Sequence, residues 1–180
     1  MLEGINAANV SAWLKDHVPE LVGEVRYSLI AGGHSNLTYQ CEDEAGNCYV
    51  LRRPPLGHVL QSAHDMGREH RIIDALSDSN VPVPLNYGLC TAAEVNGADF
   101  YVMEYVDGLV LGDYATATQV PEDKRRQVGL RVMDILCDLH TTDMDAVGLG
   151  DLGRKEAYLA RQLKRWTKQW EATKTDPIPE

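Results

Sequence analysis

Two adjacent glycines and a later arginine are the residues of this sequence whose types and spacing suit phosphate chemistry. Gly32 and Gly33 separate two apolar, β-prone runs, and Arg52 lies in a third such run. Glycine lets the backbone adopt positive φ and approach a ligand with no Cβ in the way. Amides exposed in such a turn bind phosphate oxygens, and a cation on a neighbouring strand neutralises their charge. The pattern indicates a polyphosphate site, with an ordinary hairpin and flexible tip as the alternative.

A sheet must bring these residues together, and five runs of the sequence read as its strands. Alternating polarity and β-prone composition predict strands at residues 22–30, 37–41, 48–53, 85–89 and 98–106. The second and third strands are expected to pair across a turn at residues 44–47. Pro54 and Pro55 end the third strand, because proline has no N–H to give to the ladder.

Periodic apolar residues predict helices at residues 6–18, 65–77, 121–142 and 155–172. Asn6 and Asp65 are expected to cap the first two, and Pro121 suits the first turn of the third. The last two helices are expected to bury Val128, Val132, Ile135, Leu136 and Leu139, and Leu159, Leu163, Trp166 and Trp170. Strands give way to helices near residues 104–108, which predicts a domain boundary there.

Composition and charge narrow the class of protein. The chain has 180 residues, of which 44% are apolar and 24% are charged, as in an ordinary globular protein. Its net charge of −10 disfavours nonspecific binding to nucleic acid or to an anionic membrane. No apolar run is long enough to cross a bilayer, and no signal peptide is visible.

The cysteines and two of the histidines do not read as metal ligands. Cys41, Cys48, Cys90 and Cys137 lack the CxxC spacing, which predicts buried free thiols in a reducing, cytoplasmic compartment. His58 and His64 are expected at the surface, since no cysteine or carboxylate joins them at ligand spacing.

Several stretches, in their order and spacing, resemble the aminoglycoside phosphotransferase family, in the branch related to phosphotransferase domains of some acyl-CoA dehydrogenases. They are Gly-Gly-His-Ser-Asn-Leu-Thr-Tyr at 32–39, Tyr-Val-Leu-Arg-Arg-Pro-Pro at 49–55, Arg-Glu-His-Arg at 68–71, Val-Pro-Val-Pro at 81–84, Phe-Tyr-Val-Met-Glu-Tyr-Val-Asp-Gly at 100–108, and the stretch from Leu139-His140 to Trp166. The resemblance implies an α+β, protein-kinase-like fold. Residues 1–104 would be a nucleotide-binding lobe with a five-stranded antiparallel sheet and an inserted helix. Residues 105–180 would be the hinge and the first helices of an incomplete helical lobe.

The resemblance also implies a role for particular residues toward ATP or GTP. Gly32, Gly33, His34, Ser35 and Asn36 would form the loop over the phosphates. Arg52 stands where such kinases place a lysine, and Glu69 stands where the inserted helix supplies its ion-pair partner. Arginine keeps the positive charge, but its guanidinium group is planar and larger than the ammonium group of lysine. Its contacts with a phosphate would therefore differ in geometry from those of a lysine. Met103 would line the adenine pocket, and the backbone of Glu104 and Val106 would meet the purine edge.

The catalytic machinery of that family has no counterpart here. Phosphoryl transfer needs a carboxylate to accept the hydroxyl proton and side chains to hold Mg²⁺, which the family takes from a His-Gly-Asp loop and a later aspartate. Neither motif is present, and the segments around Asp143 and Asp151 have the wrong spacing to replace them. We therefore expect no catalytic and no metal-binding residue in this chain, with Mg²⁺ bound only by the complete enzyme.

Three functions follow as hypotheses. The chain would be the N-terminal part of an ATP-dependent phosphotransferase acting on a small hydroxylated molecule. It would otherwise be a non-catalytic nucleotide-binding or regulatory module, or a fold that serves only in protein assembly. Because partner helices are missing, the helices after residue 121 are expected to expose apolar faces and to promote self-association.

Overall fold

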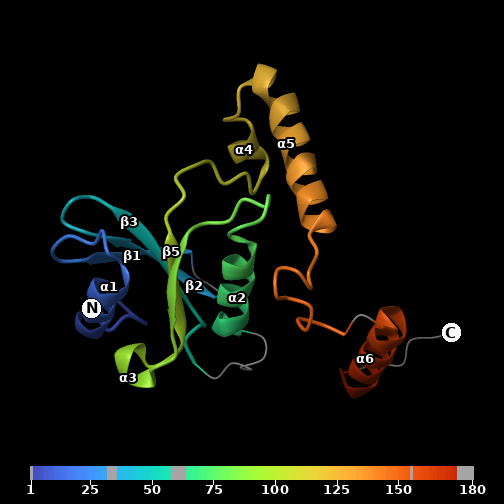
Figure 1. Ribbon diagram of the computed structural model, residues 1–180, viewed down its shortest axis with the longest axis horizontal. Helices are drawn as coiled ribbons and strands as arrows, with labels where there is room; N and C mark the ends of the chain where they lie inside the picture. The colour runs from blue at the N-terminus through green and yellow to red at the C-terminus, as the bar shows by residue number, and fades with distance from the viewer. Residues whose placement is uncertain (1, 32–35, 58–63, 155, 174–180) are drawn as a thin grey trace. The chain divides into compact units, whose positions relative to one another are not determined.

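The computed structural model describes residues 2–31, 36–57, 64–154 and 156–173 (Figure 1). The chain forms two compact units, Met1–Thr142 and Asp143–Glu180. Its elements in order are α1 (Ala7–His17), β1 (Arg26–Ala31), β2 (Leu37–Glu42), β3 (Cys48–Arg53), α2 (Met66–Leu76), β4 (Asn86–Cys90), α3 (Ala93–Asn96), β5 (Phe100–Glu104), α4 (Tyr114–Ala117), α5 (Glu122–Thr141) and α6 (Tyr158–Thr173). The α+β fold expected from the sequence is confirmed, while a division at residue 104 stays a prediction.

The strands form one antiparallel sheet in the order β1-β2-β3-β5-β4. The β2–β3 hairpin runs in register from Leu37 opposite Arg53 to Glu42 opposite Cys48. Asp43 shapes its turn, because one carboxylate oxygen accepts from the backbone N–H groups of Ala45 and Asn47 at 2.9 and 2.8 Å. The turn therefore fixes which side chains of the two strands share a face.

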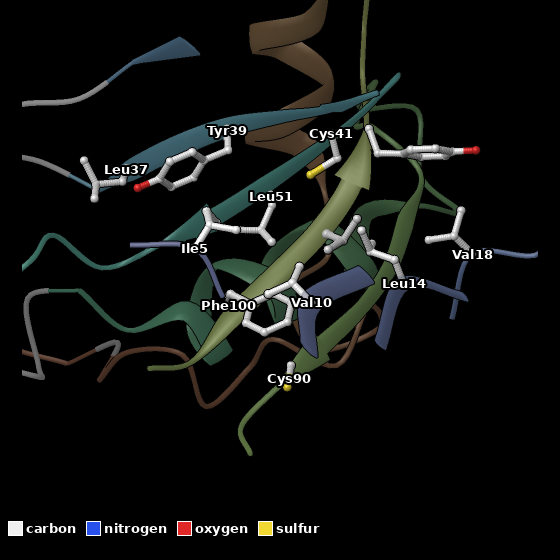
Figure 2. Close-up of a cluster of buried hydrophobic side chains, with 12 residues drawn as sticks. Ile5, Val10, Leu14, Val18, Leu37, Tyr39, Cys41, Leu51, Cys90 and Phe100 are labelled. Carbon is white, nitrogen blue, oxygen red and sulfur yellow. The ribbon is translucent and has the colours of Figure 1, made fainter. Parts of the chain in front are cut away.

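Helix α1 covers one face of the sheet and closes the hydrophobic core. Asn6 caps the helix, as expected, by accepting from the backbone N–H of Asn9 at 3.4 Å. The helix buries Val10 and Leu14 completely. Figure 2 shows these side chains packed with apolar residues of β2, β3, β4 and β5, among them Tyr39, Cys41, Leu51, Cys90 and Phe100.

The chain before α1 is attached to the same face. The Tyr39 hydroxyl donates to the carbonyl of Glu3 at 2.8 Å, and a guanidinium nitrogen of Arg53 donates to the carbonyl of Gly4. Gly4 adopts a φ of +81°, and a Cβ there would lie 2.6 Å from the Tyr39 hydroxyl oxygen. Glycine is therefore required at this close approach.

Helix α2 lies on the other side of the sheet from α1 (Figure 1) and contacts β4 and β5. Asp65 caps it by accepting from the backbone N–H of Arg68 at 2.8 Å, as the sequence predicted. Met66 and Leu76 are its buried residues. Because the cap and these contacts fix the start of α2, they also fix the face that carries Glu69 in its first turn.

The helices after the sheet differ from expectation. Pro121 is the N-cap of α5 and lies just before its first turn, and the short helices α3 and α4 were not anticipated. The stripes expected to be buried are largely exposed: Val128 and Ile135 are half-buried, whereas Val132, Leu136, Leu139, Leu159, Leu163, Trp166 and Trp170 are exposed. Cys137 is also exposed, against the expectation of a buried thiol. An apolar stripe is buried only where another element packs against it.

None of the helices in the described ranges combines the length and apolar composition that crossing a bilayer requires.

Candidate functional site

A row of polar side chains crosses the three central strands on the face opposite α1. The register pairs Thr38 of β2 with Arg52 of β3, and Arg52 with Tyr101 of β5. Successive side chains of a strand point to opposite faces. Tyr39, Leu51 and Phe100 point into the core under α1, so their neighbours in this row point toward α2.

Arg52 is held in this row by two hydrogen bonds. Its Nε donates to Oε2 of Glu69 at 2.8 Å, and Nη1 donates to the hydroxyl of Thr38 at 2.9 Å. The Arg52 and Glu69 side chains are 29% and 30% exposed. The expected ion pair between β3 and α2 is thus present. Within the described part of the chain, the guanidinium has no further partner for its remaining N–H groups.

The Glu69 carboxylate accepts from Asn36 and Tyr101 as well as from Arg52. Nδ2 of Asn36 donates to Oε1 at 2.8 Å, and the Tyr101 hydroxyl donates to Oε2 at 3.1 Å. Burial raises the pKa of the Tyr101 hydroxyl, and the adjacent Glu69 charge raises it further. Tyr101 therefore keeps its proton and donates a hydrogen bond to Oε2, while Asn36 donates one to Oε1, so that both carboxylate oxygens are fixed in place.

Asn36 connects this cluster to the segment before α2. Its Oδ1 lies 2.6 Å from Nδ1 of His64, while its Nδ2 bonds Glu69. Asn36 is buried, and His64 is half-buried. The expectation of a surface position for His64 is therefore wrong in this respect: the imidazole is engaged by the Asn36 amide.

The structure brings together only part of the site predicted from sequence. Asn36, Arg52 and Glu69 form one cluster, whereas Gly32, Gly33, His34 and Ser35 lie outside the described residues. The same applies to His58.

Met103, Glu104 and Val106 follow the cluster along β5 and beyond its end. Met103 is half-buried and lies two residues after Tyr101, which places both side chains on the same face. The backbone N–H of Glu104 donates to the carbonyl of Leu85 at 2.8 Å, and one Glu104 carboxylate oxygen accepts from the Leu85 N–H at 3.1 Å. The Glu104 N–H is therefore already engaged within the sheet, whereas Val106, beyond the end of β5, is 67% exposed.

Three residues of the cluster were not found by sequence reasoning: Thr38, His64 and Tyr101. Strand alternation held a signal for two of them. Thr38 lies beside Tyr39, and Tyr101 lies between Phe100 and Val102. In a strand, each of these hydroxyl groups must therefore point to the face opposite the core. The bond from His64 had no such signal, because His64 lies in no regular element and meets Asn36 only through the tertiary fold.

No cluster of three or more histidine, cysteine, aspartate or glutamate side chains in the described ranges is arranged to hold a metal ion. Asp143 shapes a turn, since Oδ1 accepts from the backbone N–H groups of Asp145 and Ala146 at 3.0 and 3.2 Å.

A cavity of about 780 Å³ lies near the start of α2 and is lined in part by Arg53, His64, Asp65 and Asp99. None of the residues predicted to bind nucleotide lines this cavity. Its carboxylates would oppose binding of a polyphosphate there, so the Arg52 cluster is the better candidate for an anion site.

Comparison with known proteins gives a consistent set of relatives. The sequence model of the phosphotransferase enzyme family matches residues 26–180. The chain is 36% identical over 178 residues to the acyl-CoA dehydrogenase-type protein IBR3 of Arabidopsis thaliana, across 97% of this chain and 21% of the relative. It is 37% identical over 147 residues to acyl-CoA dehydrogenase family member 10 of Mus musculus, across 82% of this chain and 14% of the relative.

A solved structure agrees with these sequence matches. A protein of Ralstonia eutropha JMP134, assigned as an aminoglycoside phosphotransferase, matches with a TM-score of 0.77 and 33% identity. The match covers 97% of this chain and 50% of that protein. The chain therefore spans half the length of this solved relative and 21% or less of the two curated relatives.

Proposed function

The chain belongs to the phosphotransferase enzyme family, and from this premise we propose that it is the nucleotide-binding, N-terminal part of an ATP-dependent phosphotransferase. The complete protein would transfer the γ-phosphate to a hydroxyl of a small molecule. GTP stays an alternative to ATP, because no side chain of the described site distinguishes the two bases. The acceptor would bind mostly outside this chain, whose residues supply the nucleotide side of the reaction.

One observation carries the proposal: a partly exposed guanidinium held rigidly at the end of a strand. Glu69 and Thr38 engage Nε and Nη1 of Arg52, while the remaining N–H groups have no partner in the described part of the chain. Guanidinium groups bind phosphate through parallel N–H bonds, and a fork that is already oriented loses little entropy when it does so. Arg52 therefore suits a phosphate group of the nucleotide.

In this proposal the residues of the chain bind and orient the nucleotide. Arg52 neutralises phosphate charge, and Glu69 prevents the guanidinium from rotating away. Mg²⁺, when bound, would neutralise further charge on the phosphates. We assign none of the described residues to the ion. Phosphate contacts by the backbone of residues 32–36 are part of the proposal and rest on the glycine pair.

The purine would lie beyond β5. The half-buried Met103 would contact its face, and the backbone after Glu104 would meet its polar edge. The Glu104 N–H is already donated to Leu85, which supports Val106 as the donor.

The remaining partners and the compartment follow from charge and thiols. A net charge of −10 supports a small-molecule acceptor and opposes nucleic acid as a partner. All four cysteines are free, which supports a reducing compartment such as the cytoplasm.

The test is nucleotide affinity of an arginine variant against a matched arginine control. Arg52→Gln should weaken binding of a fluorescent ATP analogue about 10- to 100-fold, because a charge-assisted hydrogen bond is lost. Arg26→Gln is the control: its side chain is exposed in β1 and pairs with Glu42 at 2.8 Å. Arg52→Lys should retain part of the affinity, since it keeps the charge without the fork.

Equal affinity of Arg52→Gln and Arg26→Gln would overturn the proposal. Binding by the wild-type chain, with no phosphate transferred by the complete protein to any hydroxylated metabolite, would instead support the non-catalytic module. No nucleotide binding at all would support a role in assembly.

A further inference from the structure

The Asn36 side chain is engaged at both ends, and its orientation follows from chemistry. A carboxylate only accepts hydrogen bonds, so the group 2.8 Å from Glu69 Oε1 must be the donating Nδ2. Oδ1 then faces His64, and Nδ1 of His64 must carry a proton and donate to it at 2.6 Å. The bonds form a directed chain from His64 through Asn36 to Glu69.

The Asn36 side chain is more deeply buried than expected of a side chain that contacts a ligand. Asn36 is 7% exposed, whereas the Arg52 side chain is 29% exposed. A phosphate that reached the Asn36 amide would have to displace its bond to Glu69 and leave a carboxylate oxygen without that donor. The sequence placed Asn36 among residues that cover the phosphates, but its side-chain contacts favour another role.

We propose that Asn36 is a positioning residue that, braced by His64, sets the Glu69 carboxylate and through it the Arg52 guanidinium. The proposal rests on the nucleotide site proposed above and adds a residue whose side chain acts on that site without touching the ligand. Loss of the Asn36 amide would leave Oε1 of Glu69 without this donor, while Arg52 and Tyr101 would still hold Oε2. The carboxylate would then be less firmly oriented, and so would the Arg52 guanidinium.

The position of Asn36 in the chain gives this bond a second consequence. Asn36 directly follows the predicted phosphate loop at 32–35, and His64 directly precedes Asp65, the cap of α2. Glu69 lies in the first turn of α2. The hydrogen-bond chain therefore ties the start of β2 to the start of α2, and any displacement of one requires the other to follow or the bonds to break.

The first test needs no nucleotide. The Arg52 Nε–H of the wild-type chain should give a protected NMR signal, because it is bonded to Glu69. In Asn36→Ala this proton should exchange with solvent about tenfold faster. Asn9→Ala is the control, since the Asn9 amide lies exposed on α1 and bonds the carbonyl of Glu94 at 3.0 Å. An unchanged Arg52 signal in a folded Asn36→Ala would overturn the proposal.

The second test separates positioning from direct contact by a double-mutant cycle in affinity for the fluorescent ATP analogue. Asn36→Ala should weaken binding about tenfold alone and have little further effect in a Glu69→Gln background, because its action passes through Glu69. Additive losses would show a direct ligand contact and overturn the proposal.

The two proposals fail in distinguishable ways. A wild-type chain that binds no nucleotide would overturn the nucleotide site, while the exchange measurement would still decide the role of Asn36. If Asn36→Ala does not fold, His64→Ala replaces it, with faster Arg52 Nε–H exchange expected and an unchanged rate counting against the proposal.

Discussion

Helices α1 and α5 have comparable apolar stripes in sequence, but the stripe of α1 is buried in the structure and that of α5 is largely exposed. Leu14 of α1 is 0% exposed against the sheet, whereas Leu136 of α5 is 41% exposed. Both helices have the periodicity of a helix with one buried face. The contrast teaches that periodicity identifies a face that requires a partner, while burial depends on whether a partner packs there.

The same contrast separates the Arg52 cluster from helix α6. Within the cluster, Thr38 of β2, Arg52 of β3, Tyr101 of β5 and Glu69 of α2 are joined by hydrogen bonds, and the strands that carry three of them share one core. Helix α6 instead presents Leu159, Leu163 and Trp166 to solvent. A precise site needs a packed scaffold beneath it, and the sheet with its core provides one for the cluster.

The largest expected effect tests this contrast by matched truncations. Leu14→Ala should lower the free energy of unfolding by about 2–5 kcal/mol, because it leaves a cavity in the core. Leu163→Ala, at a site 70% exposed, should change it by no more than about 0.5 kcal/mol. Urea unfolding of the two variants measures both values. Similar losses would show that α6 is packed in solution.

Thiol chemistry offers a second comparison of the same two regions. Burial raises the pKa of the Cys41 thiol in β2 to about 12, whereas Cys137 in α5 is exposed. At pH 8 a thiol with such a pKa is ionised in only about one molecule in ten thousand, and only the thiolate reacts. Iodoacetamide should therefore label Cys137 at least about 100-fold faster than Cys41, as followed by mass spectrometry. Comparable labelling rates of Cys137 and Cys41 would contradict this prediction.

Self-association is the third expected difference. The apolar side chains of α6 should pack against each other between copies of the chain. Replacing Leu163 and Trp166 together by glutamine should therefore raise the dissociation constant of self-association about tenfold or more. Lys164→Gln, a change at a charged position of the same helix, should leave it unchanged. Sedimentation velocity over a range of concentrations measures the constant. A wild-type chain that is monomeric throughout would contradict the prediction.

The smallest expected effect is the acid sensitivity of the sheet. Burial alone would raise the pKa of the Asp43 carboxyl, but the Asn47 amide and the backbone N–H groups of Val22, Asn47 and Ala45 outweigh it and lower the pKa from 3.8. The resulting stability is present above that value and is lost as the pH falls through the lower folded-state value. Wild type should thus lose unfolding free energy below about pH 4, and Asp43→Asn should lose less.

Urea titrations between neutral pH and about pH 2 test this. Asp16→Asn, an exposed carboxylate on α1, is the control and should follow the wild-type curve. An identical pH dependence for Asp43→Asn would rule out Asp43 as the source.

Local patterns predicted much of the sheet and its caps. Proline at 54, alternation along β2 and β3, and the caps Asn6 and Asp65 each act within a few residues, so the sequence alone reveals them. The ion pair of Arg52 with Glu69 was reached through a family resemblance, because the partners are 17 residues apart.

The rest of the cluster depends on contacts that no local pattern specifies. Tyr101 meets Glu69 only because β5 lies beside β3, an order that the sequence does not encode locally. His64 meets Asn36 across 28 residues. Helix α3 has four residues, which is too short to give a periodic signal.

The first 25 residues have a consequence for any attempt to excise the domain. The match to the family model starts at Arg26, so a boundary drawn from that model would discard α1 together with the contacts of Glu3 and Gly4. That cut would strip one whole side of the sheet and leave its aromatic residues facing water. Recombinant fragments should therefore begin at the N-terminus, and a purification tag is better placed elsewhere.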